Sequence, residues 1–365
     1  MFNQKRTTNE AIFFDWDEVE DFHDGFARVC KNGLWGFVNK DLKEIVPCKY
    51  NETRLFSKDG LAGVNCGGIW GFVDKDGRET IPCKYNDISA FHEGLCAVKE
   101  KDLWGFIDKN GRNIIPCSYK NAGYFSEGLA AVLVDDIWGF VDKNGKIVIS
   151  LDYDDDGFAP KYQEDLAVVC YYSKYGAIDK TGKKIINFKY DYVSDFSNGM
   201  ASVRNNEFYG YVDKTGKEVI PCKFKYDPRG KVDAVFDFKE ECARILSNGR
   251  YGFIDKKGKN ITPFIFDYAG DFDEGLACVE QNGMYGFIDQ KGNQVIPCQY
   301  EDAGDFHEGL ACVAQNGLYG FIDQRGNQVI PCQYEDAGCF HDGNAIVIKD
   351  DKYGFLSNPI STNYK

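Results

Sequence analysis

The sequence has no long apolar run. None of its segments approaches the ~18 consecutive apolar residues that a membrane-spanning helix needs, and residues 1–20 turn acidic where a secretory signal would have its apolar stretch. Basic residues are also few, since 43 Lys and Arg stand against 57 Asp and Glu, for a net charge of −14. Such a surface repels the phosphates of nucleic acids and anionic membranes. We therefore expect a cytoplasmic protein without a nucleic-acid or membrane partner.

Several signatures of chemistry are missing as well. The chain has neither a Cys-x-x-Cys pair nor a Gly-x-Ser-x-Gly nucleophile motif. Segments such as Gly139–Lys146 look like phosphate-binding loops, but five residues separate their glycines and neither Ser nor Thr follows the Lys. The sequence therefore predicts no catalytic residue, no cofactor and no metal.

What the chain does have is a repeat. An aromatic residue followed by Gly recurs at intervals close to 34 residues, with longer intervals of 37 residues before Tyr175 and 42 residues before Tyr251. A period that persists along the whole chain indicates a repeat architecture. The aromatic residues are Trp35, Trp70, Trp104, Trp138, Tyr175, Tyr209, Tyr251, Tyr285, Tyr319 and Tyr353.

Each repeat has the pattern of strands rather than helices. The aromatic residue opens an apolar segment that ends in a hairpin turn, such as GFVDKDG after Trp70. A second apolar run usually ends at Pro, for example Pro82, which would break a helix but can end a strand. Together with an incoming strand such as LACVA at residues 310–314, these segments predict a three-stranded β-meander. They exclude the helical repeat that has the same length.

The repeats are expected to form one array of about ten units over residues 12–356, between an N-terminal extension (1–11) and a C-terminal tail (357–365). The predicted fold is all-β, with tandem meanders stacked as a curved β-solenoid or superhelix. A closed, propeller-like ring is the alternative, because the chain begins and ends within a unit.

The repeats resemble a known family, the WG or KWG repeats of bacterial proteins. The Trp-Gly pairs of LWGFVNK, IWGFVDKDG, LWGFIDKNG and IWGFVDKNG carry the resemblance, which covers residues 12–356, although Tyr replaces Trp from Tyr175 onward. The resemblance implies an all-β repeat scaffold and brings no catalytic residues.

The cysteines are expected to be free thiols, mostly buried. At the position after the repeat proline, other repeats have Leu151, Phe188 and Phe264, so this position is apolar. Free thiols fit a reducing cytoplasm. The cysteines at this position are Cys48, Cys83, Cys117, Cys222, Cys298 and Cys332.

The four histidines, His23, His92, His307 and His341, also share one position, where other repeats have Ser or Asp. This pattern favours a turn residue that bonds to local backbone. If His307 and His341 face each other across neighbouring repeats, they offer two imidazoles, which alone make a weak metal site.

The acidic segment Asp152–Gly157 resembles a calcium loop, with oxygen-bearing residues at its first, third and fifth positions and Gly at its sixth. The twelfth position is Gln163 instead of Glu, and no helices are predicted beside it. We therefore interpret the segment as an acidic surface loop in a repeat lengthened by three residues, with calcium binding as the alternative.

A second insertion is the best sequence candidate for a binding site. The interval between Phe224 and Phe238 is eight residues too long, and loops on rigid scaffolds often carry binding function. The candidate partner-binding residues are Tyr226, Asp227, Arg229 and Lys231.

The sequence as a whole predicts a non-enzymatic scaffold, more a monomer than an oligomer, that binds a protein partner through an extended β surface and inserted loops. The alternative is a module that binds a glycan or small ligand. Exposed aromatics outside the repeat positions, such as Tyr171 and Tyr172, would favour that alternative, whereas a cleft that joins unlike polar residues would favour an enzyme.

Overall fold

The computed structural model describes residues 10–225 and 234–360, and the described residues contain strands but no helix. The all-β prediction is therefore confirmed. The chain forms two compact units. The first consists of Met1–Lys49, Gly249–Ile254 and Asn260–Lys365, and the second of Tyr50–Asn248 and Asp255–Lys259.

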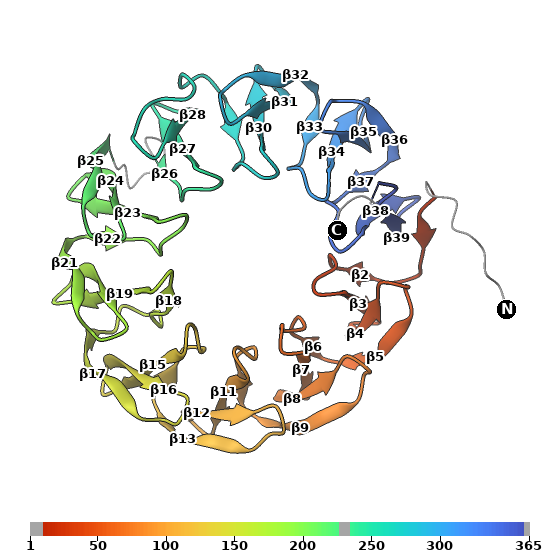
Figure 1. The fold of residues 1–365 in the computed structure, drawn as a ribbon. Coiled ribbons are helices and arrows are strands. Elements are labelled where there is room, and N and C mark those ends of the chain that lie inside the picture. Colours follow the sequence, from red (N-terminus) through yellow and green to blue (C-terminus); the bar gives the residue numbers. More distant parts are fainter. Residues whose placement is uncertain (1–9, 226–233, 361–365) are drawn as a thin grey trace. The chain divides into compact units, whose positions relative to one another are not determined.

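Each repeat folds into its own small antiparallel sheet (Figure 1). The predicted meander is present, and a short additional strand that the sequence did not indicate precedes it. The short strand is therefore the first strand of a repeat, and the incoming strand is the second. These short strands are β2 (Glu18–Val19), β6 (Glu52–Thr53), β10 (Asp87–Ile88), β14 (Asn121–Ala122), β18 (Tyr162–Gln163), β22 (Tyr192–Val193), β26 (Ala234–Val235), β29 (Tyr268–Ala269), β33 (Asp302–Ala303) and β37 (Asp336–Ala337). The incoming strands are β3 (Phe26–Lys31), β7 (Leu61–Cys66), β11 (Leu95–Glu100), β15 (Leu129–Val134), β19 (Leu166–Tyr171), β23 (Met200–Asn205), β27 (Cys242–Ser247), β30 (Leu276–Gln281), β34 (Leu310–Gln315) and β38 (Asn344–Lys349).

The aromatic-Gly pair lies in the third strand of each repeat. The repeat proline lies in the fourth strand, except for Pro263, whose segment makes only isolated bridges. The third strands are β4 (Leu34–Asn39), β8 (Ile69–Asp74), β12 (Leu103–Asp108), β16 (Ile137–Asp142), β20 (Lys174–Asp179), β24 (Phe208–Asp213), β28 (Arg250–Asp255), β31 (Met284–Asp289), β35 (Leu318–Asp323) and β39 (Lys352–Ser357). The fourth strands are β5 (Glu44–Tyr50), β9 (Glu79–Tyr85), β13 (Asn113–Tyr119), β17 (Ile147–Asp154), β21 (Lys184–Tyr190), β25 (Glu218–Lys225), β32 (Gln294–Tyr300) and β36 (Gln328–Tyr334).

The N-terminal strand β1 (Ile12–Phe13) completes the last sheet within the first unit. It pairs with β39, so that Ile12 lies opposite Phe355, and takes the edge position that a fourth strand has in other repeats. The ring of Phe22 packs edge-on against that of Phe355, with centroids 4.9 Å apart. The first and last repeats are therefore neighbours in this unit. The stacking of all repeats as a solenoid or as a ring stays a prediction.

The glycine of the aromatic-Gly pair is required by close backbone packing. A Cβ atom on Gly71 would lie 2.5 Å from the carbonyl oxygen of Ile81 and 2.6 Å from the backbone nitrogen of Cys83. The strand β9, which contains Pro82, pairs antiparallel with β8, and its register shifts beside Gly71, between Trp70 and Phe72. Only Gly lets the two backbones approach so closely.

The core lies on both faces of the third strand. In β8, Trp70, Gly71, Phe72 and Val73 are all buried. Phe72 packs edge-on against Phe91 of the following segment, with ring centroids 4.9 Å apart, and the same aromatic pair recurs in other repeats. Such T-shaped pairs add to the stability that apolar burial supplies.

Neighbouring repeats are also joined by a recurring hydrogen bond between a carboxylate and a backbone amide. In seven repeats an acidic side chain in the turn before the incoming strand accepts a hydrogen bond from a backbone N–H in the corresponding turn of a neighbouring repeat. In the second unit the pairs are Asp59 with Gly94, Glu93 with Gly128, Glu127 with Asp165, and Glu164 with Gly199. In the first unit they are Glu274 with Gly309, Glu308 with Gly343, and Asp342 with Gly25.

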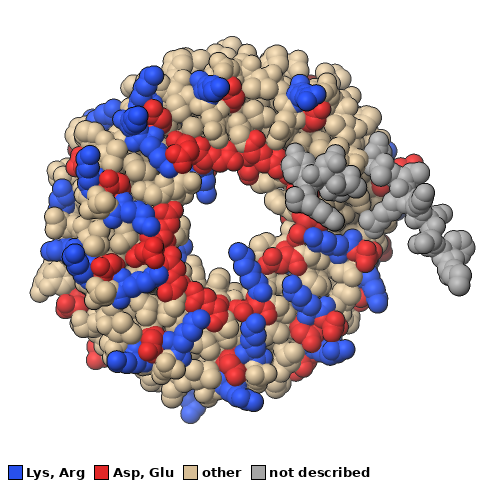
Figure 2. Space-filling model, in the orientation of Figure 1, with Lys and Arg blue, Asp and Glu red and all other residues tan. Residues whose placement is uncertain are grey.

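Several of these carboxylates also form ion pairs with lysines in a hairpin turn of a following repeat. Lys109 lies 2.9 Å from Asp59, and Lys143 lies 3.1 Å from Glu93. Acidic and basic side chains consequently lie next to one another over much of the surface in Figure 2. Partly exposed ion pairs of this kind contribute little stability individually.

Candidate functional site

The partner-binding residues predicted from the sequence, Tyr226, Asp227, Arg229 and Lys231, lie outside the described residues. Their role stays a prediction. The other interval that departs from 34 residues, between Trp138 and Tyr175, is described throughout and contains the candidate site.

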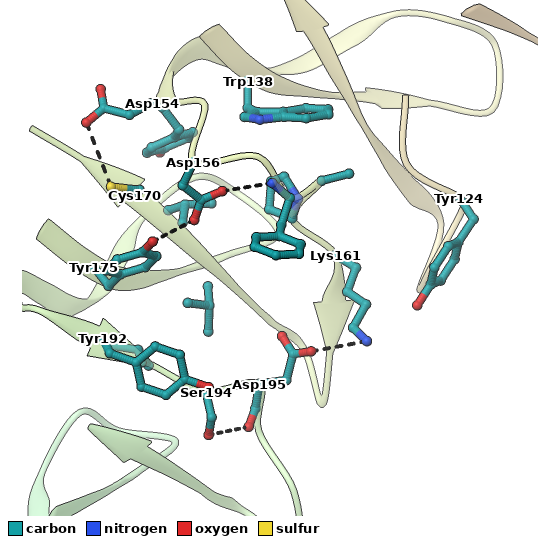
Figure 3. A pocket seen from close by; sticks show the side chains of 17 residues that line it. Tyr124, Trp138, Asp154, Asp156, Lys161, Cys170, Tyr175, Tyr192, Ser194 and Asp195 are labelled. Carbon is teal, nitrogen blue, oxygen red and sulfur yellow. Dashed lines mark hydrogen bonds and ion pairs between the residues drawn. The ribbon is translucent and has the colours of Figure 1, made fainter. Parts of the chain in front are cut away.

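A pocket of ≈ 620 Å³ lies in the second unit, in the repeat with the 37-residue interval. Its walls come from the end of β17, the following residues 155–161, the strand β19 and the short strand β22 of the next repeat (Figure 3). This volume is enough for a small ligand or for one or two side chains of a partner.

The pocket is associated with the three additional residues of this repeat. Tyr153 and Tyr162 occupy positions that are six residues apart in regular repeats, but here they are nine residues apart. Tyr162 still replaces the repeat Phe, because its ring packs edge-on against Phe140 with centroids 5.0 Å apart. The additional residues extend the connection at 155–161, which forms no strand.

The usual short strand is missing from this repeat. In β18, Tyr162 lies opposite Ala167 and Gln163 opposite Leu166, which is the position of the single bridge, such as Ser126 with Leu129, that other repeats form before the incoming strand. In the nine other repeats the short strand pairs with the fourth and fifth residues of the incoming strand, as β14 does with β15. Within the described residues, the middle of β19 therefore has no short strand beside it, and the pocket lies there.

Three carboxylates at the pocket are held by different donors. The backbone N–H of Ser173 donates to Asp154 at 2.8 Å, the indole Nε1 of Trp138 donates to Asp155 at 3.0 Å, and the hydroxyl of Tyr175 donates to Asp156 at 2.8 Å. Asp154 and Asp156 line the pocket. These bonds fix acidic groups beside aromatic rings.

The lining is otherwise aromatic and aliphatic. Tyr153, Tyr175 and Tyr192 contribute rings, and Val168 and Val193 contribute aliphatic side chains. Phe158 also lines the pocket and is 80% exposed, although a side chain of this kind is usually buried. An exposed aromatic at the mouth of a pocket is a typical contact for a partner.

Lys161 is the one basic residue among those that line the pocket, and its ammonium group lies 3.1 Å from the carboxylate of Asp195. Burial acts to lower the pKa of Lys161, but the neighbouring Asp195 outweighs this effect and raises it. Lys161 is therefore a cation at neutral pH whose charge is compensated by Asp195. Asp154 and Asp156 leave the pocket with an excess of acidic groups.

The pocket does join unlike polar residues, which is the feature that would favour an enzyme. Burial, followed by the neighbouring Asp154, raises the pKa of the Cys170 thiol to about 11. Burial and the hydrogen bond to Asp156 raise the pKa of Tyr175 well above its usual value. Both groups are therefore protonated at neutral pH, so neither has the ionisation that a nucleophile or general base needs.

The calcium alternative for Asp152–Gly157 is not supported by side-chain geometry. Asp154, Asp155 and Asp156 bond to separate donors, as described above, instead of converging on one point. Among residues 10–225 and 234–360, no three His, Cys, Asp or Glu side chains gather in a way that would hold a metal ion.

His307 and His341 do face each other, with ring centroids 4.8 Å apart. His307 also lies 3.4 Å from the carboxylate of Asp273. The histidines border turns, as predicted, since each pairs in a single bridge with the first residue of the incoming strand, for example His307 with Leu310.

The expectation of fourteen free thiols is wrong for one pair, because Cys66 and Cys83 form a disulfide. Cys66 ends β7, at a position that Lys31 and Glu100 hold in other repeats. Its Cα atom lies 6.2 Å from that of Cys83, although β8 separates β7 from β9 in the sheet. The other twelve cysteines are free. Those that follow the proline, such as Cys48, are half-buried rather than buried, because their strand lies at the edge of its sheet.

The aromatic residues outside the repeat positions give a mixed result. Tyr172 is 79% exposed, whereas Tyr171 is half-buried and packs edge-on against Tyr172 with ring centroids 4.6 Å apart. Neither residue lines the pocket. The 37-residue interval was noted in the sequence but was interpreted as a surface loop. The signal that sequence reasoning did not use was the widened spacing of Tyr153 and Tyr162.

No helix with the length and apolar character needed to cross a membrane occurs among the described residues.

These features define the class of the protein: an all-β protein of tandem antiparallel meander units, with one irregular repeat that opens a pocket. The family model of the WG containing repeat matches the chain ten times, and the chain belongs to this family. The matched residues are 9–35, 35–68, 70–104, 104–136, 138–175, 175–207, 209–251, 251–285, 285–319 and 319–353.

The chain is similar to solved structures at low sequence identity. A eukaryotic initiation factor is 10% identical with a TM-score of 0.50, and the match covers 91% of this chain and 98% of that chain. BamB from Moraxella catarrhalis is 8% identical with a TM-score of 0.36, covering 84% of this chain and 99% of its own. Hsv2 from Kluyveromyces lactis is 10% identical with a TM-score of 0.36, covering 65% and 91%. Comparison with curated proteins by sequence gave no match. At these identities the likeness concerns the fold alone.

Proposed function

We propose that the protein is a non-enzymatic repeat scaffold that binds a protein partner at the pocket beside β19. The observation that carries the proposal is the coincidence of the lengthened repeat with the pocket. Polar residues of the regular repeats recur at fixed positions and serve turns and contacts between repeats. Asp154, Asp156, Phe158 and Lys161 belong instead to the irregular segment, and all four line the pocket.

The ionisation of the pocket residues supports binding rather than catalysis. Cys170 and Tyr175 are held protonated at neutral pH, and Lys161 is paired with Asp195. Catalysis needs a group whose pKa suits proton transfer or nucleophilic attack at the working pH. We include the cytoplasmic location and the monomeric state in the proposal, because the net charge of −14 and the number of free thiols favour them.

The test is capture of partners from a lysate of the source cell by the purified protein, with and without the substitution Phe158→Ala. A partner that uses the pocket should be captured by the wild type and at least ten-fold less by Phe158→Ala. The matched control is Tyr172→Asn, which removes an equally exposed aromatic outside the pocket. Capture that is the same for all three proteins contradicts the proposal.

A glycan or small ligand is the second candidate, and the exposure of Tyr172 favours it, because exposed aromatic rings stack on sugars. Binding to a glycan array separates the two candidates. Glycan binding that Tyr172→Asn abolishes and Phe158→Ala leaves intact would support the second candidate and contradict the first.

A further inference from the structure

We infer that the partner binds as an added β-strand: an extended peptide segment with a basic side chain pairs with the free edge of β19 at Val168–Cys170. The inference rests on the proposed function and adds the chemistry of the occupant and its mode of binding.

The edge of β19 directs backbone groups into the pocket. β19 and β20 are joined by a two-residue turn, with Tyr171 opposite Lys174, Cys170 opposite Tyr175 and Val168 opposite Ala177. In such a hairpin every second residue exchanges both hydrogen bonds with its partner, beginning with the pair next to the turn. Val168 and Cys170 are the residues in between, which exchange no hydrogen bonds with their partners in β20. Their N–H and C=O groups therefore point away from β20. Both residues line the pocket.

In regular repeats these backbone groups are satisfied by the chain itself. In the preceding repeat, Lys120 N–H donates to the Leu133 carbonyl and Gly123 N–H donates to the Ala131 carbonyl, both at 2.9 Å. In the following repeat, Asp191 and Ser194 donate in the same way to Arg204 and Ser202, again at 2.9 Å.

The corresponding carbonyls in the irregular repeat are those of Cys170 and Val168. Within residues 10–225 and 234–360, no backbone N–H donates to either of them. β18 pairs only with the start of β19, and residues 155–161 pass around the pocket instead of along the strand. Unpaired strand edges are templates for an added strand, and buried backbone groups are normally bonded. The nine regular repeats show which occupant fits this position: an extended backbone.

Charge indicates which side chain the peptide carries. Asp154 and Asp156 face the pocket, and the charge of Lys161 is compensated by Asp195. The rings of Tyr175 and Tyr192 lie beside the same cavity, and aromatic rings next to carboxylates attract an ammonium or guanidinium group. A Lys or Arg side chain that extends from the added strand would meet both features. Main-chain pairing would give affinity, and this pocket would give specificity.

The probe for the test is a displayed library of random twelve-residue peptides, selected on the wild-type full chain. Selected peptides should contain Lys or Arg more often than the unselected library. After synthesis, their affinity is measured by fluorescence anisotropy. Replacement of the basic residue of a selected peptide by Ala should weaken binding at least ten-fold.

Two variants of the protein test the edge itself. Val168→Pro removes an N–H that points into the pocket and leaves the bonds between β19 and β20 in place, so peptide affinity should fall at least ten-fold. The matched control Val168→Ala keeps the N–H and should change affinity less than three-fold. The second variant deletes residues 157–159, which restores the six-residue spacing between Tyr153 and Tyr162. Its own short strand should then cover β19, so that binding is lost while thermal stability is kept or raised.

Peptides that bind both edge variants as tightly as the wild type overturn the inference, and so does a selection that yields no binder. These results are distinguishable from failure of the proposed function. A partner that is lost with Phe158→Ala but retained with Val168→Pro supports the pocket as the site and contradicts strand addition. If Val168→Pro does not fold, the deletion variant and the basic-residue requirement of the peptides still decide the question.

Discussion

The carboxylate of Asp342 accepts a hydrogen bond from the backbone N–H of Gly25 at 2.8 Å, although 317 residues separate the two along the chain. The same contact joins consecutive repeats, for example Glu308 with Gly343 at 2.9 Å. Lys40 adds an ion pair to Asp342 at 2.8 Å, as Lys109 does to Asp59. The last repeat is therefore bonded to the first repeat in the way that consecutive repeats such as those of Glu274 and Glu308 are bonded to the next.

Asp342→Asn should destabilise the first unit. The substitution removes a charge-assisted hydrogen bond and an ion pair, which together are expected to contribute about 1–2 kcal/mol at a partly exposed site. Thermal and urea unfolding measure the effect. Glu207→Gln is the control, because it removes the same charge from an exposed turn, and it should change stability by less than about 0.5 kcal/mol.

The same contact should make stability depend on pH in the acid range. Burial acts to raise the pKa of Asp342, but Lys40 and the Gly25 N–H outweigh it and hold the pKa below the usual value of 3.8. The contribution of a group with a lowered folded-state pKa is complete above pH 3.8 and is lost as the pH falls through the folded-state pKa. Unfolding followed between pH 2.5 and 6 should show a smaller acid loss in Asp342→Asn than in the wild type. Equal acid losses would contradict the assignment.

Reduction should lower the stability of the second unit. The Cys66–Cys83 disulfide closes a loop over a sequence separation of 17, and a loop of this size is expected to contribute about 3 kcal/mol. Thiol titration after denaturation without reductant should find the twelve free cysteines, and fourteen after reduction. Cys66→Ser should have the stability of the reduced wild type in either redox condition. Fourteen thiols without reductant would show that the pair is open.

Gly71→Ala should be among the most destabilising single-methyl substitutions in the protein, at about 3 kcal/mol or more, because the added carbon would meet backbone atoms on β9 that have no room to move. The control is Gly338→Ala, whose added carbon would meet nothing nearer than 3.4 Å. Similar melting temperatures for the two variants would show that the backbones of β8 and β9 can move apart at Gly71.

Much of the fold could be predicted because its signals are periodic. The aromatic-Gly pair, the hairpin turns and the proline each recur at fixed offsets, and the structure has a strand wherever they place one in the best-preserved repeats. The short strands could not be predicted, because each is two residues long and its residues vary from Glu18 to Tyr192. Their pairing is determined by the neighbouring strand and leaves no pattern in their own side chains.

The candidate site illustrates the same limit. The lengthened interval between Tyr153 and Tyr162 is visible in the sequence, but its effect is the loss of the short strand beside the middle of β19, which depends on backbone pairing. The disulfide was missed for a related reason, since Cys66 in β7 and Cys83 in β9 approach each other across β8 only in the folded sheet. The prediction that Cys83 is a free thiol rested on the residues at the same position in other repeats. It did not consider that Cys66 lies close to Cys83 in the fold.

The missing short strand beside the middle of β19 has a consequence for how such proteins acquire new specificities. Every regular repeat already contains an incoming strand whose edge is covered by only two residues, so a three-residue insertion at that point is enough to uncover it without disturbing the core of the repeat. The segment from Asp154 to Tyr162 should therefore be transferable: grafted into a regular repeat, it would create a second receptor groove, and the array would become bivalent at the cost of one small insertion.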